Sequence, residues 1–229
     1  MNLSNRLEKI SNMITEVESV VDVGTDHAYV PIYLVNNNII KRAIASDINK
    51  GPVKKAEDNV SKYNLQSKIE CRLGGGLTTI KPCEVEAGII AGMGGNLIRD
   101  IIEERMNVFK SLKYLIVQPV QNPEVLREYI YKSKIEIIDE AVIKEDNKFY
   151  EILKIRYNGK DQIIDPIYYE ISKILLERKD STMKEYLEFK LRKYNSICST
   201  LTQNTESAIK RKKELDKNIK KIEEFLLCF

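Results

Sequence analysis

Short apolar runs alternate with amphipathic stretches along roughly the first two-thirds of the chain. The apolar runs have no polar face, which is typical of strands buried on both sides of a parallel sheet. The stretches between them have the three- and four-residue spacing of helices that cover such a sheet. The predicted strands are Ser19–Val23, Ala43–Ile48, Ile69–Arg72, Ala87–Ala91 and Tyr114–Gln118. The predicted helices are Tyr29–Asn38, Gly51–Tyr63, Gly94–Arg105 and Pro123–Ser133, preceded by an amphipathic helix with Leu3, Leu7, Ile10, Met13 and Ile14.

Two β-rich runs close this region without a helix between them. They are Ile135–Ile143 and Phe149–Tyr157, and such a pair predicts an antiparallel hairpin at one edge of the sheet. Parallel strands followed by this hairpin are the layout of Rossmann-like methyltransferases, whereas dinucleotide-dependent dehydrogenases usually complete a second parallel half. The predicted fold class is therefore α/β, with the Rossmann-like sheet of a class I methyltransferase.

The pattern beyond Asn158-Gly-Lys160 is helical. Two apolar series have the heptad spacing of a coiled coil: Leu187, Leu191, Tyr194, Cys198 and Leu201, then Leu215, Ile219, Ile222 and Leu226. The polar cluster Thr200–Thr205 lies between them and predicts a turn, hence a helical hairpin. A single continuous helix is the alternative, because the heptad register survives the gap. We expect a methyltransferase domain at residues 1–159 and a helical coiled-coil domain at residues 160–229.

Charge is divided unevenly between these two parts. The net charge of +3 comes entirely from residues 160–229, which hold 15 Lys+Arg against 12 Asp+Glu, while residues 1–159 hold 22 of each. A basic excess on helices suits contact with a polyanion, although a solvated helical pair has the same composition.

Composition narrows the class of protein further. A hydrophobic fraction of 43% supports a packed core. The sequence has no apolar run near the 18 residues or so that a membrane span needs, and no secretory leader pattern. The four cysteines have no spacing that suggests a zinc or redox site. We expect a cytoplasmic protein without metal or membrane contact.

Candidate ligand-binding residues follow the first two strands. Gly24 comes after Asp22 at the end of the first strand, where a glycine lets backbone N–H groups approach a ligand at the following helix. Asp47 ends the second strand, about 20 residues further on, where a carboxylate can accept both hydroxyls of a ribose. The alternative is that Asp47 only caps the next helix.

The loop after the first strand is not a dinucleotide fingerprint. G-x-G-x-x-G needs a glycine where Asp26 stands. A desolvated carboxylate would repel a pyrophosphate by several kcal/mol, whereas a sulfonium with an ammonium group accepts nearby acids. The sign of this charge favours S-adenosylmethionine over NAD.

Two further strand ends belong to the same predicted crevice. Ala91-Gly-Met-Gly-Gly95 leaves room for a flat ligand against the backbone, unless it is only a tight strand-to-helix turn. Gln118-Pro119 ends the fifth strand. His27 is the single histidine in the chain. Its place in the cofactor loop makes it a candidate for an active-site role, and a structural or incidental role is the alternative.

Together these residues resemble one family, the bacterial tRNA (adenine-22, N1)-methyltransferases. The similarity covers nearly the whole chain, and its motifs are Leu3-Ser-Asn-Arg-Leu7, Asp22–Pro31, Gly51-Pro52, Ala91–Gly95, Gln118-Pro119 and Leu126-Arg-Glu128. The resemblance implies S-adenosylmethionine as methyl donor, N1 of adenine 22 in tRNA as acceptor, and tRNA contact by the C-terminal helices. We expect the protein to be a monomer.

The resemblance also implies residue roles. It implies that the methionine end of the cofactor is contacted by Asp22, Gly24, Thr25 and Asp26. It implies that the ribose and adenine are contacted by Asp47, Ile48, Gly74 and Gly75. Beside the methyl group it implies Ala91, Gly92 and Met93, and next to the target base or the methionine tail it implies His27 and Tyr29. We take Asp26, His27 and Tyr29 as the catalytic candidates.

Two positions depart from the family pattern. The family has Gly-Asp-Gly-Leu after the third strand, where the acid meets the adenine amino group, but this chain has Gly74-Gly-Gly-Leu77. The family's Gln-Pro-Asn becomes Gln118-Pro-Val120. Weaker cofactor binding is expected from Gly75. An NAD-dependent oxidoreductase and a non-catalytic RNA-binding protein remain the alternative classes.

Overall fold

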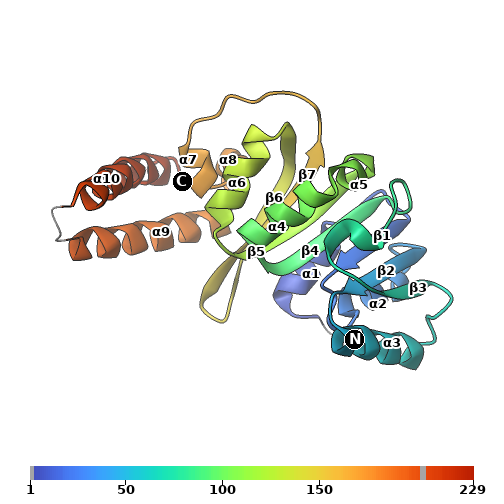
Figure 1. Ribbon diagram of the computed structural model, residues 1–229. Coiled ribbons are helices and arrows are strands. Elements are labelled where there is room, and N and C mark those ends of the chain that lie inside the picture. The colour runs from blue at the N-terminus through green and yellow to red at the C-terminus, as the bar shows by residue number, and fades with distance from the viewer. Residues whose placement is uncertain (1–2, 202–204) are drawn as a thin grey trace. The chain divides into compact units, whose positions relative to one another are not determined.

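A single mixed sheet organises the first part of the chain (Figure 1). The computed structural model describes residues 3–201 and 205–229. Strand order is β3-β2-β1-β4-β5-β7-β6, with the first five strands parallel and the last two antiparallel. The bounds are β1 Ser19–Val23, β2 Arg42–Asp47, β3 Ile69–Leu73, β4 Ala87–Gly94, β5 Tyr114–Gln121, β6 Ile135–Glu145 and β7 Lys148–Tyr157. The predicted class I methyltransferase sheet is confirmed.

Helices cover both faces of this sheet. One face packs against α1 (Asn5–Asn12), α2 (Tyr29–Asn36) and α3 (Lys50–Lys62). The other face packs against η1 (Gly76–Thr79), α4 (Gly95–Glu104), α5 (Met106–Ser111) and α6 (Pro123–Lys132). Alternation of the chain between strand and helix in this way brings the carboxyl ends of the five parallel strands to one edge.

The two strands nearest the hairpin run past their predicted ends. β4 extends to Gly94 and β5 to Gln121, so each is three residues longer than the apolar pattern indicated. The register between them passes from Ala91 opposite Gln118 to Met93 opposite Pro119, which leaves Gly92 as an extra, unpaired residue. This bulge at the carboxyl edge bends β4 where a ligand would approach.

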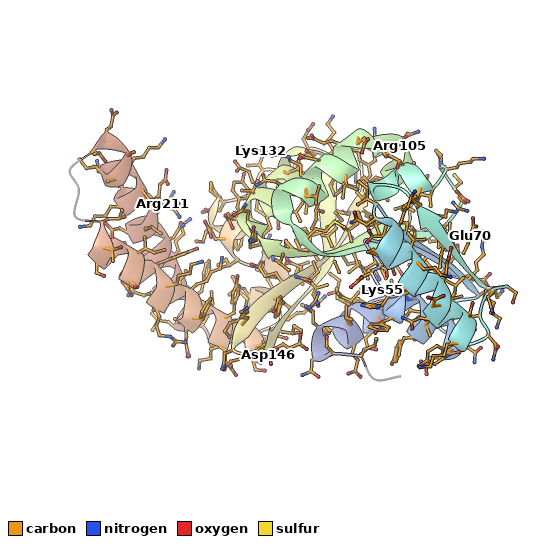
Figure 2. All side chains as sticks on the ribbon, turned by 60° about the horizontal axis from the view of Figure 1, so that its bottom comes forward. Lys55, Glu70, Arg105, Lys132, Asp146 and Arg211 are labelled. Atoms are coloured by element: carbon orange, nitrogen blue, oxygen red, sulfur yellow. The ribbon has the colours of Figure 1, made fainter. Side chains whose placement is uncertain are left out.

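The β6–β7 hairpin projects beyond the strand that it joins. β7 pairs with β5 only from Leu153 to Ile155, so its earlier residues continue past Val117 toward the carboxyl edge. Asp146 and Asn147 form the tip with φ of 49° and 60°, as a type I′ turn requires, and Figure 2 labels Asp146 there.

A buried charge cluster ties the hairpin to α6. Arg127 donates from Nε and Nη2 to Glu151 Oε2 at 2.9 and 2.7 Å, and its Nη1 forms an ion pair with Glu140. All three side chains are buried. Removing a partner from such a cluster leaves an uncompensated charge in the core, so the cluster fixes the hairpin on the helix.

The chain divides into two compact units, Met1–Ile163 and Ile164–Phe229. The second unit consists of α7 (Ile167–Glu170), α8 (Lys173–Glu177), α9 (Ser181–Thr200) and α10 (Glu206–Leu226). α9 and α10 pack side by side, so the alternative of one continuous helix is wrong. The predicted turn Thr200–Thr205 includes residues 202–204, which lie outside the described residues.

The apolar seam of α9 differs from the predicted one. Its buried positions include Met183, Leu187, Lys190 and Tyr194, whereas Leu191 and Cys198 are half-buried. Lys190 occupies the seam because Glu170 accepts from its Nζ at 3.2 Å and from the Tyr194 hydroxyl at 2.5 Å. A paired charge is thus buried one residue before Leu191, the position that the heptad pattern assigned to the seam.

Two absences apply to residues 3–201 and 205–229. No helix there is both long and apolar enough to cross a membrane. The same residues contain no group of three or more His, Cys, Asp or Glu side chains arranged to hold a metal ion.

Candidate cofactor and active site

The predicted site residues follow neighbouring strands and meet at one edge of the sheet. Ser46 O in β2 accepts the N–H groups of Gly24 and Thr25 at 2.8 and 3.0 Å. Asp47 O in turn accepts the N–H of Gly74 at 2.9 Å. These bonds connect the loops after β1, β2 and β3, so the structure brings the proposed methionine, ribose and adenine contacts together.

Asp22 is the buried acid of the site. Thr25 Oγ1 donates to its Oδ2 at 2.6 Å, and only 7% of the residue is exposed. Burial raises the pKa of Asp22 to about 6; the Thr25 hydrogen bond opposes this shift, and the nearby charge of Asp47 adds to it. A carboxylate that is costly to ionise in this way is well placed to be stabilised by a cationic ligand.

Gly24 forms the turn beneath this acid. Its φ of +76° is in the left-handed region, and a Cβ there would lie 2.3 Å from Met93 Cε. Gly92 also has a left-handed φ, +79°, but a Cβ there would have no neighbour within 4 Å. The loop after β1 is therefore in contact with the end of β4 through Met93, while Gly92 faces open space at the edge.

Asp47 has two candidate roles, which are the acceptance of ribose hydroxyls and the capping of the next helix. Its Oδ1 accepts the backbone N–H of Asn49 at 2.8 Å, and Asn49 caps the N-terminus of α3. Asp47 is therefore not the cap residue of α3, but one of its carboxylate oxygens bonds to the residue that is. A ribose would have to share or displace that bond, or use Oδ2.

The carboxyl edge of the sheet beyond Asp47 carries exposed apolar side chains. Ile48 is 70% exposed and Leu73 is 52% exposed. Gly75 lies beside them, and a Cβ on it would touch only Ile48, at 3.4 Å from Cδ1. Exposed aliphatic side chains around a glycine fit the faces of an adenine ring, because they offer apolar area that is otherwise left in water.

The three catalytic candidates lie together between β1 and the first residue of α2. His27 Nε2 is 3.1 Å from Asp26 Oδ2, and the His27 ring stacks on the Tyr29 ring with centroids 4.9 Å apart and planes 8° from parallel. Lys55 Nζ is 3.7 Å from Asp26 Oδ1. Asp26 therefore lies at the surface between the side chains of His27 and Lys55, whereas the buried acid beside this loop is Asp22.

Several residues that the sequence interpretation missed hold this loop. Asn59 Nδ2 donates to His27 O at 3.0 Å, and Lys55 lies one helical turn before Asn59 on α3. Their four-residue spacing was the available signal, since it places both on one side of that helix. Arg6, whose motif was noted without a role, donates from Nη1 to Gln118 Oε1 at 2.6 Å.

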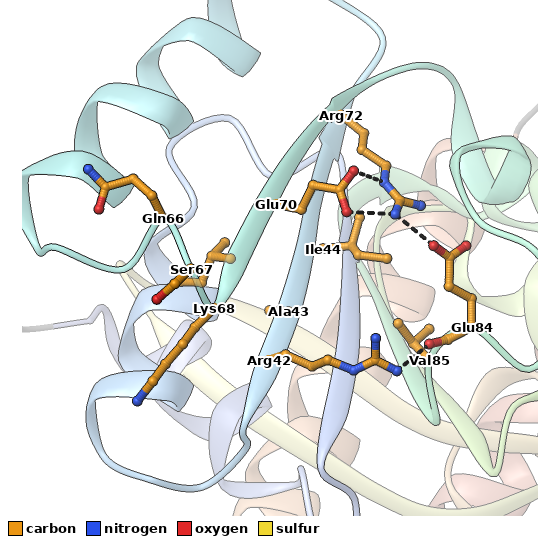
Figure 3. Close-up of a pocket in the computed structure, with 11 residues that line it drawn as sticks. Arg42, Ala43, Ile44, Gln66, Ser67, Lys68, Glu70, Arg72, Glu84 and Val85 are labelled. Carbon is orange, nitrogen blue, oxygen red and sulfur yellow. Dashed lines mark hydrogen bonds and ion pairs between the residues drawn. The ribbon is translucent and has the colours of Figure 1, made fainter.

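A cavity of about 360 Å³ lies elsewhere, at the amino ends of β2 and β3 (Figure 3). Arg72 Nη2 lies 2.7 Å from Glu70 Oε2 and 2.6 Å from Glu84 Oε1 beside it. Arg42 donates to Glu84 O at 2.8 Å. These guanidinium and carboxylate groups compensate one another, and the cavity includes none of the predicted site residues.

A sheet of five parallel strands that is completed by an antiparallel hairpin, with an acid at the carboxyl end of both β1 and β2, defines a Rossmann-like methyltransferase. Comparison with known proteins makes this specific. The sequence profile of the TrmK family, described as tRNA (adenine(22)-N(1))-methyltransferase, matches residues 20–224. The chain belongs to this family.

Individual relatives are similar over almost their whole length. The tRNA (adenine(22)-N(1))-methyltransferase of Bacillus subtilis is 33% identical, covering 99% of this chain and 98% of the relative. The crystal structure of the B. subtilis m1A22 tRNA methyltransferase TrmK has a TM-score of 0.85 and 32% identity, covering 98% of this chain and 99% of that one. M. capricolum TrmK in complex with S-adenosyl-homocysteine has a TM-score of 0.84 and 28% identity, covering 96% and 98%.

Proposed function

We propose that this protein transfers the methyl group of S-adenosylmethionine to N1 of adenine 22 in tRNA. The observation that carries the proposal is the convergence of Asp22, Gly24, Asp47 and Ala91–Met93 at one sheet edge, in a chain of the TrmK family. The B. subtilis relative named above is a methyltransferase of the same nucleotide, and the M. capricolum TrmK structure holds S-adenosyl-homocysteine, the cofactor product.

The residues present fit a cofactor of this kind. Asp22, with Thr25 bonded to it, would meet the methionine ammonium, because its buried carboxylate gains most from a cation. Asp47 would accept the ribose hydroxyls. Ile48 with Gly74 and Gly75 would enclose the adenine, and Gly24 with Ala91–Met93 would form the surface beside the methyl group.

The reaction needs positioning more than acid–base chemistry. The bound cofactor supplies an electrophilic methyl group on a sulfonium. A bond forms from adenine N1 to the methyl carbon as the carbon–sulfur bond breaks, which leaves a cationic base and a neutral thioether. No proton moves in this step, because the N1 lone pair is free at neutral pH. The protein's contribution is alignment and exclusion of water.

Asp26, His27 and Tyr29 are proposed to form the target-base side of the site. In a folded tRNA the N1 edge is hidden by pairing or stacking, so the base must be exposed by local opening. Because the His27 and Tyr29 rings already stack, a base arriving on the exposed Tyr29 face would extend that stack. Tyr29→Ala should raise the KM for tRNA while leaving the Kd for S-adenosylmethionine within about twofold, since one stacked base contributes about 1–3 kcal/mol. Unchanged tRNA kinetics would remove Tyr29 from this role.

The helical unit is proposed to bind the phosphate backbone of the tRNA. α10 carries a run of exposed cations, Lys210, Arg211, Lys212 and Lys213, followed by Lys217 and Lys220. Replacing the four consecutive cations by Gln in the full chain should weaken tRNA binding. The slope of log Kd against log salt should fall by about one for each phosphate that the helix no longer neutralises. An unaltered salt slope would assign another role to α10.

Transfer of label from S-adenosylmethionine to unmodified tRNA tests the proposal. We expect transfer to tRNA with adenine 22 and none to the same tRNA with guanine at that position. A Rossmann-type oxidoreductase would instead bind NADH and transfer no methyl group. A non-catalytic RNA-binding protein would bind S-adenosylmethionine and tRNA without turnover. We further propose that the protein works as a monomer in the cytoplasm.

A further inference from the structure

Gly92 has an amide that the sheet does not use. The β4–β5 ladder skips this residue, so its N–H lies outside the regular strand pairing. The acceptor that it finds is a side chain, Gln118 Oε1, at 3.1 Å. The conformation of the bulge, next to the proposed methyl-transfer position, therefore depends on how Gln118 is oriented.

Gln118 could present either end of its amide to Gly92. Only its carbonyl oxygen can accept an N–H, whereas the nitrogen would face Gly92 as a second donor. Gln118 is fully buried, so a wrong orientation would leave two donors opposed without water to separate them. Its Nε2 donates to Pro119 O at 2.9 Å, which suits the orientation that Gly92 needs.

Arg6 selects this orientation from the N-terminal helix. Its Nη1 donates to the same Gln118 Oε1, at 2.6 Å. Since a guanidinium has donors and no acceptor, it binds the oxygen end of the amide and disfavours the nitrogen end. Arg6 is itself held by the β6–β7 hairpin: Glu145 Oε1 accepts its backbone N–H at 3.3 Å, and its Cζ lies 5.5 Å from the Tyr150 ring centroid.

We propose that Arg6 is a positioning residue for methyl transfer, which fixes the Gly92 bulge through Gln118. This proposal rests on the proposed function for its effect on turnover. The contact between Arg6 and Gln118 joins α1 to β5, and Gly92 extends it to β4. Arg6 itself is assigned no contact with the reacting atoms.

The kinetic test compares Arg6→Met, Gln118→Leu and the double variant in the full chain. Methionine keeps an unbranched side chain of similar length but removes the guanidinium and its donors. Because small misplacement near reacting atoms is costly, kcat for Arg6→Met should fall about tenfold or more, with the tRNA KM within about twofold. The double variant should have the kcat of Gln118→Leu alone, since residues acting through one contact are not additive. Arg6→Lys, which keeps a donor-only group, should restore most of kcat.

Arg42→Met is the matched control. Arg42 Nη2 also donates to a neighbour, Glu84 O at 2.8 Å, but this contact lies at the amino ends of the strands. The kcat of Arg42→Met should therefore match that of the unmodified protein. Multiplicative losses in the double variant, or a loss confined to the tRNA KM with an altered salt slope, would overturn the proposal in favour of direct tRNA contact.

Hydrogen exchange of the Gly92 amide gives a readout that does not need activity. Arg6→Met should speed exchange of this amide about tenfold or more, because its acceptor is no longer held, and Arg42→Met should not. Unchanged Gly92 exchange in Arg6→Met would refute the positioning role even if turnover fell. Accelerated exchange in a protein that methylates no tRNA would support the Arg6 contact and reject the proposed function.

Discussion

Replacing Asp22 by Asn should stabilise the protein and weaken its cofactor binding at the same time. Burial raises the pKa of Asp22 from 3.8 to about 6, so at pH 8 the folded protein holds an ionised carboxylate in a site that disfavours it. The difference between the two pKa values corresponds to about 3 kcal/mol of lost folding free energy. Asp22→Asn removes the charge and keeps an oxygen that can accept from Thr25, so the gain should be about 1–3 kcal/mol.

The pH dependence of this gain follows from the sign of the shift. Between pH 3.8 and about 6 the folded state keeps a proton on Asp22 that the unfolded state has released. The stability of the unmodified protein should therefore fall across this window as the pH rises, relative to the variant. Below about pH 4 the two proteins should be equally stable, and above about pH 7 the difference should be constant.

Urea unfolding of both proteins from pH 4 to 8 measures this difference directly. Other acids, such as Glu84 with its pKa lowered to about 2 by Arg72, affect both proteins alike and cancel. Asp100→Asn, a change of an exposed carboxylate, is the control and should show no such pH dependence. If Asp22→Asn is no more stable than the unmodified protein at pH 8, the burial argument for Asp22 is wrong.

The same substitution has the opposite effect on the cofactor. Without its charge, position 22 cannot pair with the methionine ammonium, and the Kd for S-adenosylmethionine should rise about tenfold or more at pH 8. In the unmodified protein the affinity should fall as the pH drops below about 6, because Asp22 becomes protonated. Calorimetric titration at pH 5.5 and 8 checks both effects.

Two glycine substitutions test the geometry of the edge. Gly95→Ala should destabilise the protein by about 1–3 kcal/mol, because its Cβ would lie 2.3 Å from the backbone oxygen of Asn122. A Cβ at Gly94 would have no neighbour within 4 Å, so Gly94→Ala should cost less than about 1 kcal/mol. Equal unfolding midpoints for the two variants would contradict this geometry. Gly75→Asp should lower the Kd for S-adenosylmethionine about tenfold, because the new carboxylate adds one charged hydrogen bond. The structure has room for this side chain, since its Cβ would meet only Ile48 at ordinary contact distance. Unchanged affinity would show that no adenine amino group lies there.

Local periodicity predicted most of the sheet but not how its strand ends are held. β1 has the predicted bounds, because five buried residues, three of them valines, stand between polar turns. The extension of β4 to Gly94 was missed, since glycines carry no hydrophobic signal and the bulge at Gly92 depends on Gln118.

Hydrogen bonds between segments that lie far apart in the chain could not be predicted from the sequence pattern either. Arg6 and Gln118 are 112 residues apart, and neither type of side chain reveals its partner. The Lys190 position in the α9 seam was likewise hidden, because its burial depends on a carboxylate twenty residues earlier. The candidate site could be located from strand ends and motifs, whereas the bonds among its residues required the fold.

The position of the methyl group on a tRNA substrate decides whether the proposed reaction is right. The unmodified protein should be incubated with S-adenosylmethionine and a tRNA transcript, and the product digested and analysed by mass spectrometry. We predict a single 1-methyladenosine at position 22. A methyl group on the exocyclic N6, or on any other nucleotide, would contradict the proposed reaction.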